Sequence, residues 1–556
     1  MMKKLRIFKS WRSILIAVTI GVFSTLLIAF DDTDDFELAK NMDIYHTLIR
    51  ELRLYYVDDI EISKVFKTSI DDMLATLDPY TVYYPESEIE EFKFMTTGQY
   101  GGIGALIRTE KDQIIIEEIY ENYPAAKAGL KAGDIIKKVG DHQANPSSYD
   151  DLSVLMKGLP DTEVEITVLR PTDNKLYVKK LIRERITVEN VPYFGMLNNN
   201  TGYISLTGFT QNAYGEVKAA LIKLKEQNAN RIILDIRSNP GGLLIEAVNI
   251  VSLFVDKGTP IVSMKGKIKN SNHNFVTTID PVDTQIPVCV LVNRNSASAS
   301  EIVSGAIQDL DRGIIIGERT YGKGLVQETR DLSYNAKLKV TTAKYYIPSG
   351  RCIQALDYTH RNSDGSVGYI PDSLISEFMT KGGRKVYDGG GVSPDIKVNE
   401  SIISSISQYL FANMIVFNYA TIFASEHDSI AKPVEFNLSD QEYNAFIDYV
   451  LSMKIEYKSE TQKMLEQLVE TAKKEKYYQK TEVEINVLKN ALKHNFKDDL
   501  LYFKDEVKEL LEGEIIKRYY YRKGSILKNI SENESIVKAI EVMNDKSKYN
   551  SLLKPQ

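Results

Sequence analysis

Residues 286–301 read IPVCVLVNRNSASASE, an apolar run that passes directly into a serine-rich turn. The β-branched residues from Ile286 to Val292 predict a buried strand, and the spacing of apolar residues from Ala299 to Leu310 predicts a helix. Ser298 therefore stands where the strand gives way to the N-terminus of the helix. Backbone N–H groups at such an end lack partners and favour negative charge, as an attacking alkoxide and a tetrahedral oxyanion require.

A second stretch, TYGKGLVQ at residues 320–327, supplies a candidate base because Lys323 lies between two glycines. A lysine can accept a proton from serine only when it is neutral. Its pKa must then fall from about 10.4 to about 7.4, which corresponds to about 4 kcal/mol and requires a dry site. Two simpler interpretations remain open: Ser298 and Glu301 as an ordinary capping box, and Lys323 as a solvated surface residue.

A third stretch, RIILDIRSNPGG at residues 231–242, reads as a buried strand that ends in a turn, with an apolar helix from Leu243 to Phe254 after it. Glycines at this turn let a substrate backbone approach closely. The N–H groups of Gly241 or Gly242, with that of Ala299, are candidates for an oxyanion hole. The alternative is a plain turn at the start of a helix.

Strands and helices alternate through this part of the chain, which predicts an α/β domain with a largely parallel sheet. The expected elements are strands at 202–206, 232–236, 288–292 and 314–317, helices near 215–227, after 242 and after 298, and a further strand at 338–348.

An upstream region resembles a PDZ domain, through QYGGIG at residues 99–104, PAAKAGLKAGDII at 124–136 and an alternating strand at 163–169. Glycine-rich backbone can present several N–H groups to one carboxylate, while a strand edge pairs with the peptide behind it. The resemblance implies that this module reads the free C-termini of proteins. Its expected carboxylate-binding loop consists of Tyr100, Gly101, Gly102, Ile103 and Gly104.

Taken together, the three stretches resemble the carboxy-terminal processing proteases, the tail-specific serine peptidases of family S41. The resemblance spans about residues 35 to 400 and implies that Ser298 is the nucleophile, Lys323 the general base and Gln327 the residue that orients the lysine. Lys323 follows Ser298 by 25 residues, as in that family. Relatives carry an arginine before Gly158 that couples peptide binding to the active site. This chain has Lys157 there, which lacks the planar fork of arginine.

The N-terminus carries five basic residues before an uncharged run from Ile14 to Phe30, and four aspartates follow it closely. Basic residues stay in the cytoplasm, so the remainder is expected to be exported. Residues 1–30 are therefore a signal anchor or a cleavable signal peptide. We expect a protein of the bacterial inner membrane with its catalytic part in the periplasm.

The remaining segments carry little chemistry. Residues 31–95 predict a helical region, with Ile44, Leu48, Leu52 and Tyr55 at helical spacing, for contacts of a homodimer or higher oligomer or for packing within one chain. Residues 401–556 predict a C-terminal helical domain, in which Arg518 to Lys523 read as a solvated helix face. Between these regions lie the PDZ-like domain at 96–172 and the protease core at 173–400.

Composition limits the function further. The net charge of −7 is spread along the chain without a basic stripe, which argues against nucleic acid as a partner. Cys289 and Cys352 lie far from any histidine at metal-ligand spacing, so we expect free thiols, no metal and no cofactor. The six histidines are dispersed, which disfavours a Ser-His-Asp triad.

The sequence thus predicts a serine endopeptidase that cuts proteins near their C-termini through an acyl-enzyme, with substrates selected by the PDZ-like module. Two alternatives are a non-catalytic PDZ scaffold and a structural envelope protein.

Overall fold

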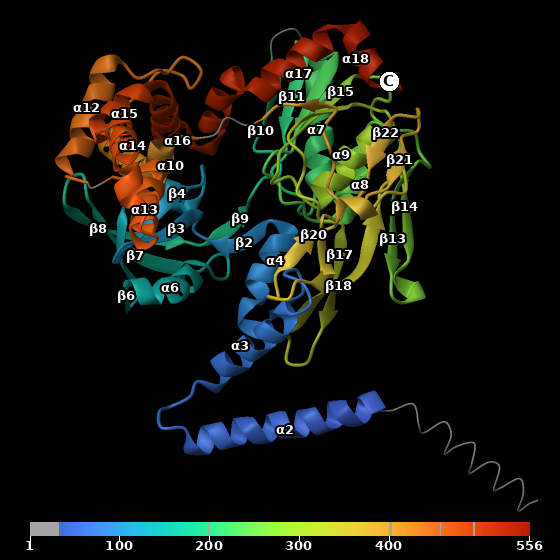
Figure 1. Ribbon diagram of the computed structural model, residues 1–556, viewed down its shortest axis with the longest axis horizontal. Helices are drawn as coiled ribbons and strands as arrows, with labels where there is room; N and C mark the ends of the chain where they lie inside the picture. The colour runs from blue at the N-terminus through green and yellow to red at the C-terminus, as the bar shows by residue number, and fades with distance from the viewer. Residues whose placement is uncertain (1–32, 198–199, 400–402, 456, 493–494, 556) are drawn as a thin grey trace, which may run out of the picture. The chain divides into compact units, whose positions relative to one another are not determined.

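A computed structural model describes residues 33–555 except 198–199, 400–402, 456 and 493–494 (Figure 1). The predicted signal segment at residues 1–30 lies outside the described residues. The chain divides into two compact units at Tyr83/Tyr84.

The first unit contains helices α2 (Thr33–Tyr55) and α3 (Ile62–Ala75). Tyr45 of α2 contacts Phe66 of α3 edge-on, with ring centroids 5.7 Å apart. Within the described part of the chain, no helix combines the length and the apolar character needed to cross a membrane. Several apolar side chains of α2 are exposed, among them Phe36, Met42, Ile44, Leu48 and Tyr55.

The second unit is built around a six-stranded sheet with the order β10-β11-β12-β15-β16-β23. Every neighbouring pair is parallel except β10 and β11, in agreement with the predicted α/β core. The bounds are β10 Tyr193–Leu197, β11 Thr201–Ser205, β12 Arg231–Asp235, β15 Val288–Val292, β16 Ile314–Gly317 and β23 Ile396–Lys397.

Both faces of this sheet are buried, because successive side chains of a strand point to opposite faces. Ile204, Leu234 and Val290 pack in one cluster with residues of helices α7 (Ala213–Glu226), α8 (Leu244–Ser252) and α9 (Ala299–Asp309). Their sequence neighbours Tyr203, Ile233 and Leu291 pack in another with residues of α17 (Glu534–Asn544) and α18 (Lys546–Leu552). The last two helices of the chain therefore complete the protease core.

A second, antiparallel sheet and two hairpins complete this region. In the sheet, β17 pairs with β18, β18 with β13 and β13 with β14. The bounds are β1 Val82–Tyr84, β13 Pro260–Gly266, β14 His273–Val276, β17 Leu325–Asp331, β18 Lys337–Tyr346, β19 Leu356–Arg361, β20 Val367–Tyr369, β21 Glu377–Met379 and β22 Lys385–Tyr387.

The PDZ-like module has a sheet of order β3-β4-β5-β7-β8 with β6 beside β5, and it leaves β3 at the edge. It follows helix α4 (Ile89–Thr97), and β2 and β9 form a separate antiparallel pair. The bounds are β2 Gln99–Gly102, β3 Ala105–Glu110, β4 Gln113–Ile119, α5 Pro124–Lys127, β5 Ile135–Val139, β6 His142–Gln143, α6 Tyr149–Met156, β7 Glu163–Arg170, β8 Lys175–Ile182 and β9 Glu184–Thr187.

The C-terminal region is helical, as predicted, and has a core of its own that includes Leu410, Phe446 and Leu511. The bounds are α10 Ser405–Ala412, α11 Ile415–Glu426, α12 Asp440–Ser452, α13 Glu460–Lys474, α14 Tyr478–Ala491, α15 Phe496–Tyr502 and α16 Lys504–Glu532. Helix α16 is broken at Tyr521, where φ is 53° and ψ is −163°.

The run Arg518 to Lys523 is a solvated helix face only in part, because Arg522 and Lys523 are exposed whereas Arg518 to Tyr521 are not, so this prediction is wrong for the first four residues. The Arg518 side chain is only 7% exposed; its guanidinium lies 4.3 Å from the Phe417 ring centroid and hydrogen-bonds the Phe417 carbonyl oxygen (3.1 Å). Tyr521 packs against the core of the PDZ-like module. Tyr521 thus contributes to a contact between two modules, and Arg518 is buried within the helical region, which the polarity of the run alone does not indicate.

Candidate active site

The predicted nucleophile lies at the junction between β15 and α9. Val288–Val292 is buried throughout, and Ser298 is the N-cap residue directly before Ala299, the first residue of the helix. Ser298 has φ 57° and ψ −113°, a conformation that residues with a side chain rarely adopt. Such strain is common where a fold presents a nucleophile on a sharp strand-to-helix turn. The capping interpretation also holds, because Glu301 accepts a hydrogen bond from the Ser298 N–H (2.9 Å).

Glu301 joins the serine turn to the lysine loop. Its Oε2 accepts hydrogen bonds from the backbone N–H groups of Ser298 (2.9 Å) and Lys323 (2.8 Å). Its Oε1 accepts from the Thr320 hydroxyl (2.6 Å) and the Gly322 N–H (2.7 Å). Four donors on one fully buried carboxylate fix the two segments relative to each other. Burial raises the pKa of Glu301 to about 7, although these four donors lower it.

Tyr345 of β18 gives a second link between the same two segments. Its hydroxyl lies 3.1 Å from the carbonyl oxygen of Ser298 and 2.7 Å from that of Lys323. Burial raises the pKa of this hydroxyl well above its usual value, so it remains a proton donor. Ser298 and Lys323 are 25 residues apart in the sequence, and the structure brings their backbones together.

Gln327 lies on β17, four residues after Lys323, and its side chain contacts the neighbouring strand β18. Its amide nitrogen donates to the Thr341 hydroxyl of β18 (3.1 Å). This bond fixes the direction of the amide. That Gln327 orients the lysine remains a prediction.

The glycine turn after β12 lies directly against the nucleophile. A Cβ atom added to Gly241, which has φ +99°, would lie 2.8 Å from the Ser298 Cβ and 2.9 Å from the Ala299 nitrogen. Only glycine fits this approach. Buried Asn239 joins the two turns, because its carbonyl oxygen accepts from the Ala297 N–H (3.1 Å) and the Ser300 hydroxyl (2.9 Å).

The backbone donors of this turn are not equivalent. The Gly241 N–H donates to Asn239 Oδ1 at 2.9 Å and is therefore occupied. The N–H groups of Gly242 and Ala299 have no hydrogen-bond partner among the described residues. Of the two glycines left open by the sequence, Gly242 is the one with a free donor.

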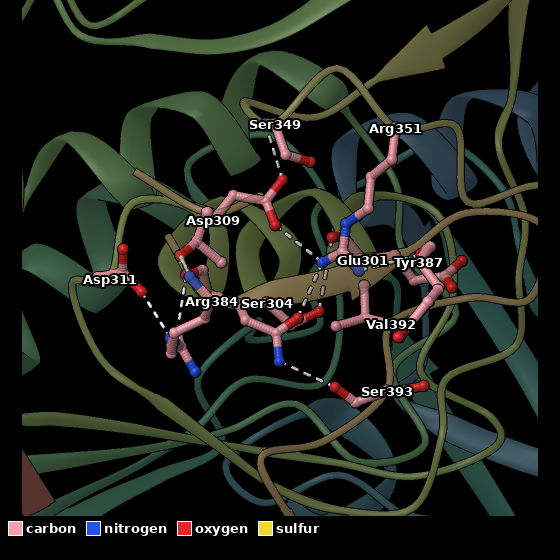
Figure 2. Close-up of polar contacts among 12 residues, drawn as sticks. Glu301, Ser304, Asp309, Asp311, Ser349, Arg351, Arg384, Tyr387, Val392 and Ser393 are labelled. Carbon is pink, nitrogen blue, oxygen red and sulfur yellow. Dashed lines mark hydrogen bonds and ion pairs between the residues drawn. The ribbon is translucent and has the colours of Figure 1, made fainter. Parts of the chain in front are cut away.

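The far end of α9 is held by buried charges (Figure 2). Arg351 and Asp309 pair at 2.8 Å with side chains 1% and 0% exposed, and the Ser349 N–H donates to the other oxygen of Asp309 (2.9 Å). Arg384 pairs with both Asp311 (2.6 Å) and Asp395 (2.5 Å). Breaking such pairs leaves an uncompensated buried charge, so they fix the helix whose first turn carries the nucleophile.

A further ion pair lies at the start of the glycine turn. Arg237 pairs with Asp235 at 2.6 Å, and both side chains are largely buried. The Tyr203 hydroxyl donates to the same Asp235 oxygen (2.8 Å). This pair and the roles of Glu301, Tyr345 and Asn239 were not predicted. The sequence offered one signal, a glutamate among the apolar and small residues of the first two turns of α9.

The PDZ-like module has a groove of about 440 Å³ bordered by β3, α6 and α4. Three residues of the predicted loop line it, namely Tyr100, Gly101 and Ile103, and Lys157 lines it as well. Gly102 and Gly104 lie instead where an added Cβ would meet the side chains of Tyr100 (2.6 Å) and Tyr123 (2.4 Å). Gly101 allows a close approach, since an added Cβ would lie 2.0 Å from the Gly158 carbonyl oxygen. An edge strand beside a groove is suited to binding an extended peptide.

Both cysteines are free, and burial raises the pKa of each thiol. Cys289 lies within β15, inside the sheet. Among the residues that the structure describes, no group of three or more His, Cys, Asp or Glu side chains could hold a metal ion.

Comparisons with known proteins define the class. Residues 200–360 match the model of peptidase family S41, residues 115–170 that of the PDZ domain, and residues 406–543 that of a probable PDZ-protease C-terminal helical domain. The carboxy-terminal-processing protease of Bartonella bacilliformis is 34% identical over 327 residues, 58% of this chain and 74% of the relative. A probable CtpA-like serine protease of Staphylococcus epidermidis is 34% identical over 61% of this chain and 69% of its own length.

The chain therefore belongs to the carboxy-terminal processing proteases of peptidase family S41 and is a serine peptidase with a PDZ domain. This assignment overrides the two non-catalytic alternatives, a scaffold and a structural protein. Solved structures with similarity include a photosystem II D1 C-terminal processing protease, at 27% identity over 64% of this chain and 92% of that chain, with a TM-score of 0.35. Another is the PDZ domain of a Vibrio cholerae carboxy-terminal protease, at 30% identity over 16% of this chain and 99% of that chain, with a TM-score of 0.15.

Proposed function

We propose that this protein cleaves the C-terminal tails of other proteins with Ser298 as nucleophile and Lys323 as general base. The observation that carries the proposal is the single buried carboxylate of Glu301, which holds the backbone of both residues. Beside it, the N–H groups of Gly242 and Ala299 have no partner among the described residues. A nucleophile, a base and two unpaired donors on three adjoining segments are the parts that acyl transfer requires.

In the acylation step, the neutral amine of Lys323 accepts the hydroxyl proton as Ser298 Oγ attacks the scissile carbonyl carbon. The negative charge moves to the carbonyl oxygen, where the two N–H groups stabilise it. The tetrahedral intermediate then collapses. The C–N bond breaks, the lysine ammonium returns the proton to the leaving amine, and the released piece is the C-terminal tail.

In the deacylation step, water attacks the Ser298 ester and Lys323 again accepts the proton. The ester C–O bond breaks, the serine hydroxyl is restored by the proton from the lysine, and the shortened protein leaves with a new carboxylate. Gln327 is assigned the orientation of Lys323, with its amide held by Thr341. A denatured protein digested with the enzyme and analysed by mass spectrometry tests the proposal, because new C-termini must appear.

The PDZ groove is the proposed reader of the substrate tail. Replacing the C-terminal carboxylate of a cleavable peptide by an amide removes one charged hydrogen bond, about 1.5 to 3 kcal/mol. We expect kcat/KM to fall by about tenfold or more. Initial rates on the free-acid and amidated forms of one peptide, at concentrations below KM, measure this ratio. Equal rates would show that the module does not select C-termini.

A glycine pair provides a matched control within the module. Gly101→Ala places a methyl group 2.0 Å from the Gly158 carbonyl oxygen and should abolish the preference for the free acid. Gly140→Ala adds the same methyl group where no atom lies within 4 Å; its φ of +57° makes alanine mildly strained there, but the groove is untouched and the preference should be retained. Loss of the preference in both variants would point to general damage of the module.

We also propose export to the envelope, with the basic and apolar segment before Asp31 as anchor or signal peptide. The charge distribution of that segment supports this location.

Self-association is proposed for the region that contains α2, whose apolar side chains Phe36, Met42 and Leu48 are each more than half exposed. Fractionation of cells and sedimentation of the purified protein test these two points separately.

A further inference from the structure

The C-terminal helical region reaches the catalytic turn through one side chain. Asn533 lies between α16 and α17, and its Oδ1 accepts the N–H groups of Ser535 (3.1 Å) and Ile536 (3.3 Å) at the start of α17. The same oxygen accepts a hydrogen bond from Arg237 Nη1 at 2.6 Å. Asn533 is therefore both the cap of a helix and a partner of an arginine that lies 296 residues earlier in the chain.

Arg237 is held from two sides, and the glycine turn begins directly after it. Its Nε and Nη2 atoms bond to the carboxylate of Asp235 at 2.6 to 3.1 Å, and its Nη1 bonds to Asn533. Because a guanidinium is planar, partners on both sides fix the orientation of the whole group.

The residues that follow transmit this position to the nucleophile. The N–H of Ser238, with φ 56°, donates to Asn293 Oδ1 at 2.8 Å. The next residue is Asn239, whose contacts join this turn to the serine turn. A shift of Arg237 would therefore displace the Gly242 N–H relative to Ser298. The proposed oxyanion donor would then move from its place, and such small displacements lower the catalytic rate steeply.

We propose that Asn533 is a positioning residue of the active site, which holds the oxyanion turn through Arg237. This inference rests on the proposed function, since it assigns the turn to oxyanion stabilisation. It gives the C-terminal region a role in catalysis that acts through Arg237 and not through direct contact of Asn533 with the substrate. The expected defect lies in kcat, because the contact positions a donor that acts mainly in the transition state.

Asn533→Ser separates the two roles of the side chain. Serine caps a helix about as well as asparagine, but it is shorter and does not reach Arg237. We expect kcat to fall by about tenfold with KM unchanged, because misplacing the oxyanion donor lowers the rate of the chemical step. The melting temperature should fall slightly, because the lost hydrogen bond is present in the folded protein. Asn533→Asp should restore kcat to within about threefold, because a carboxylate accepts from both partners.

The matched control is Asn495→Ser, the same substitution at the N-cap of α15, where the exposed Asn495 accepts from the Asp498 N–H (2.9 Å). Its kcat should equal that of the wild type. If Asn533→Ser and Asn495→Ser have equal kcat, or if Asn533→Asp is as impaired as Asn533→Ser, the inference is wrong.

A double-mutant cycle tests the route through Arg237. Lysine at position 237 can still pair with Asp235 but cannot hold two partners in one plane, so Asn533→Ser should add little to Arg237→Lys. Additive losses would overturn the inference. Full activity of Ser298→Ala in the same assay would overturn the proposed function instead, so the two failures are distinguishable.

Discussion

Ser298→Ala and Lys323→Ala are each expected to lower kcat by about 10⁴-fold or more, because each removes one half of a single proton-transfer unit. The double variant should be no slower than either single variant, since residues that act as a unit are not additive. Peptide cleavage followed by chromatography measures the rates. Circular dichroism of each variant establishes that the fold is retained.

The surrounding contacts determine which controls are valid. Ser296 is unsuitable, because its buried hydroxyl donates to the Ile236 carbonyl oxygen (2.8 Å) and accepts from the Asn293 N–H (3.0 Å). Ser304→Ala removes only hydroxyl bonds to the backbone carbonyl oxygens of Ser300 (2.9 Å) and Glu301 (3.5 Å) in the preceding helical turn, and Lys344→Ala removes an exposed lysine of β18. Both should retain nearly full activity. Near wild-type cleavage by Lys323→Ala would refute the assignment of the base.

Glu301→Gln is expected to lower kcat by about 10²-fold or more, since a small misplacement of reacting groups costs about that factor. The carboxylate accepts four hydrogen bonds, two on each oxygen. Glutamine replaces one of these oxygens by an NH₂ group, which faces two donors and can accept from neither. Either the Ser298 and Lys323 N–H groups, or the Thr320 hydroxyl and the Gly322 N–H group, then lose their acceptor.

Glu328→Gln on β17 is the control, because that residue makes an exposed ion pair with Arg330 and none of the bonds at the active site. If Glu301→Gln and Glu328→Gln cleave peptides at the same rate, the carboxylate does not position the catalytic pair.

The pKa of Glu301 gives this prediction a pH dependence with opposite signs for activity and stability. The ionised carboxylate accepts all four bonds, so activity should fall as the pH decreases through about 7. Lys323 must also be neutral to act as the base, so the pH at which activity rises cannot lie below this value. We expect activity at pH 6 to be at most about a tenth of that at pH 8.

Stability should change in the other direction. The folded-state pKa of Glu301 is raised above its ordinary value of 4.5, so its contribution to stability is full below that value and is lost as the pH rises through about 7. Melting temperatures between pH 5 and pH 8 measure this effect, and Glu301→Gln should remove it. The Glu301 contribution to stability therefore does not explain low activity at pH 6, and the melting temperature at that pH shows whether the protein is folded in the assay. A flat activity profile from pH 6 upward would contradict both the carboxylate role and a lysine base.

Sequence reasoning predicted those parts of the site that depend on local pattern. The β-branched apolar run before Asn293 predicted a buried strand, and the spacing of apolar residues after Ser298 predicted a helix, so the position of the nucleophile turn followed. The choice between Gly241 and Gly242 was not predictable, because it depends on the direction of one amide, that of Asn239.

Contacts between segments far apart in the sequence could not be predicted, because local patterns do not report them. Glu301 has the sequence signature of a helix cap, and nothing local shows that its carboxylate also accepts from Gly322 and Lys323. Arg518 to Lys523 read as solvent-exposed because charge patterns report an average preference, whereas burial is decided by the partner surface. The contact of Asn533 with Arg237 joins segments whose sequences carry no mutual signal.

The packing of α17 and α18 determines where this protein can be truncated without loss of the fold. The recognisable protease motifs end before residue 400, and a protein truncated there would appear complete by sequence. It would expose Ile233, Leu291 and Ile316 on one face of the sheet. In the intact chain these residues are covered by Ile536, Val542 and Tyr549. It would also lack the Tyr549 hydroxyl, which bonds the backbone of Val288. Such a fragment would aggregate rather than report on the isolated peptidase. The helical cluster is better removed by an internal excision that keeps the last two helices attached to the sheet they complete.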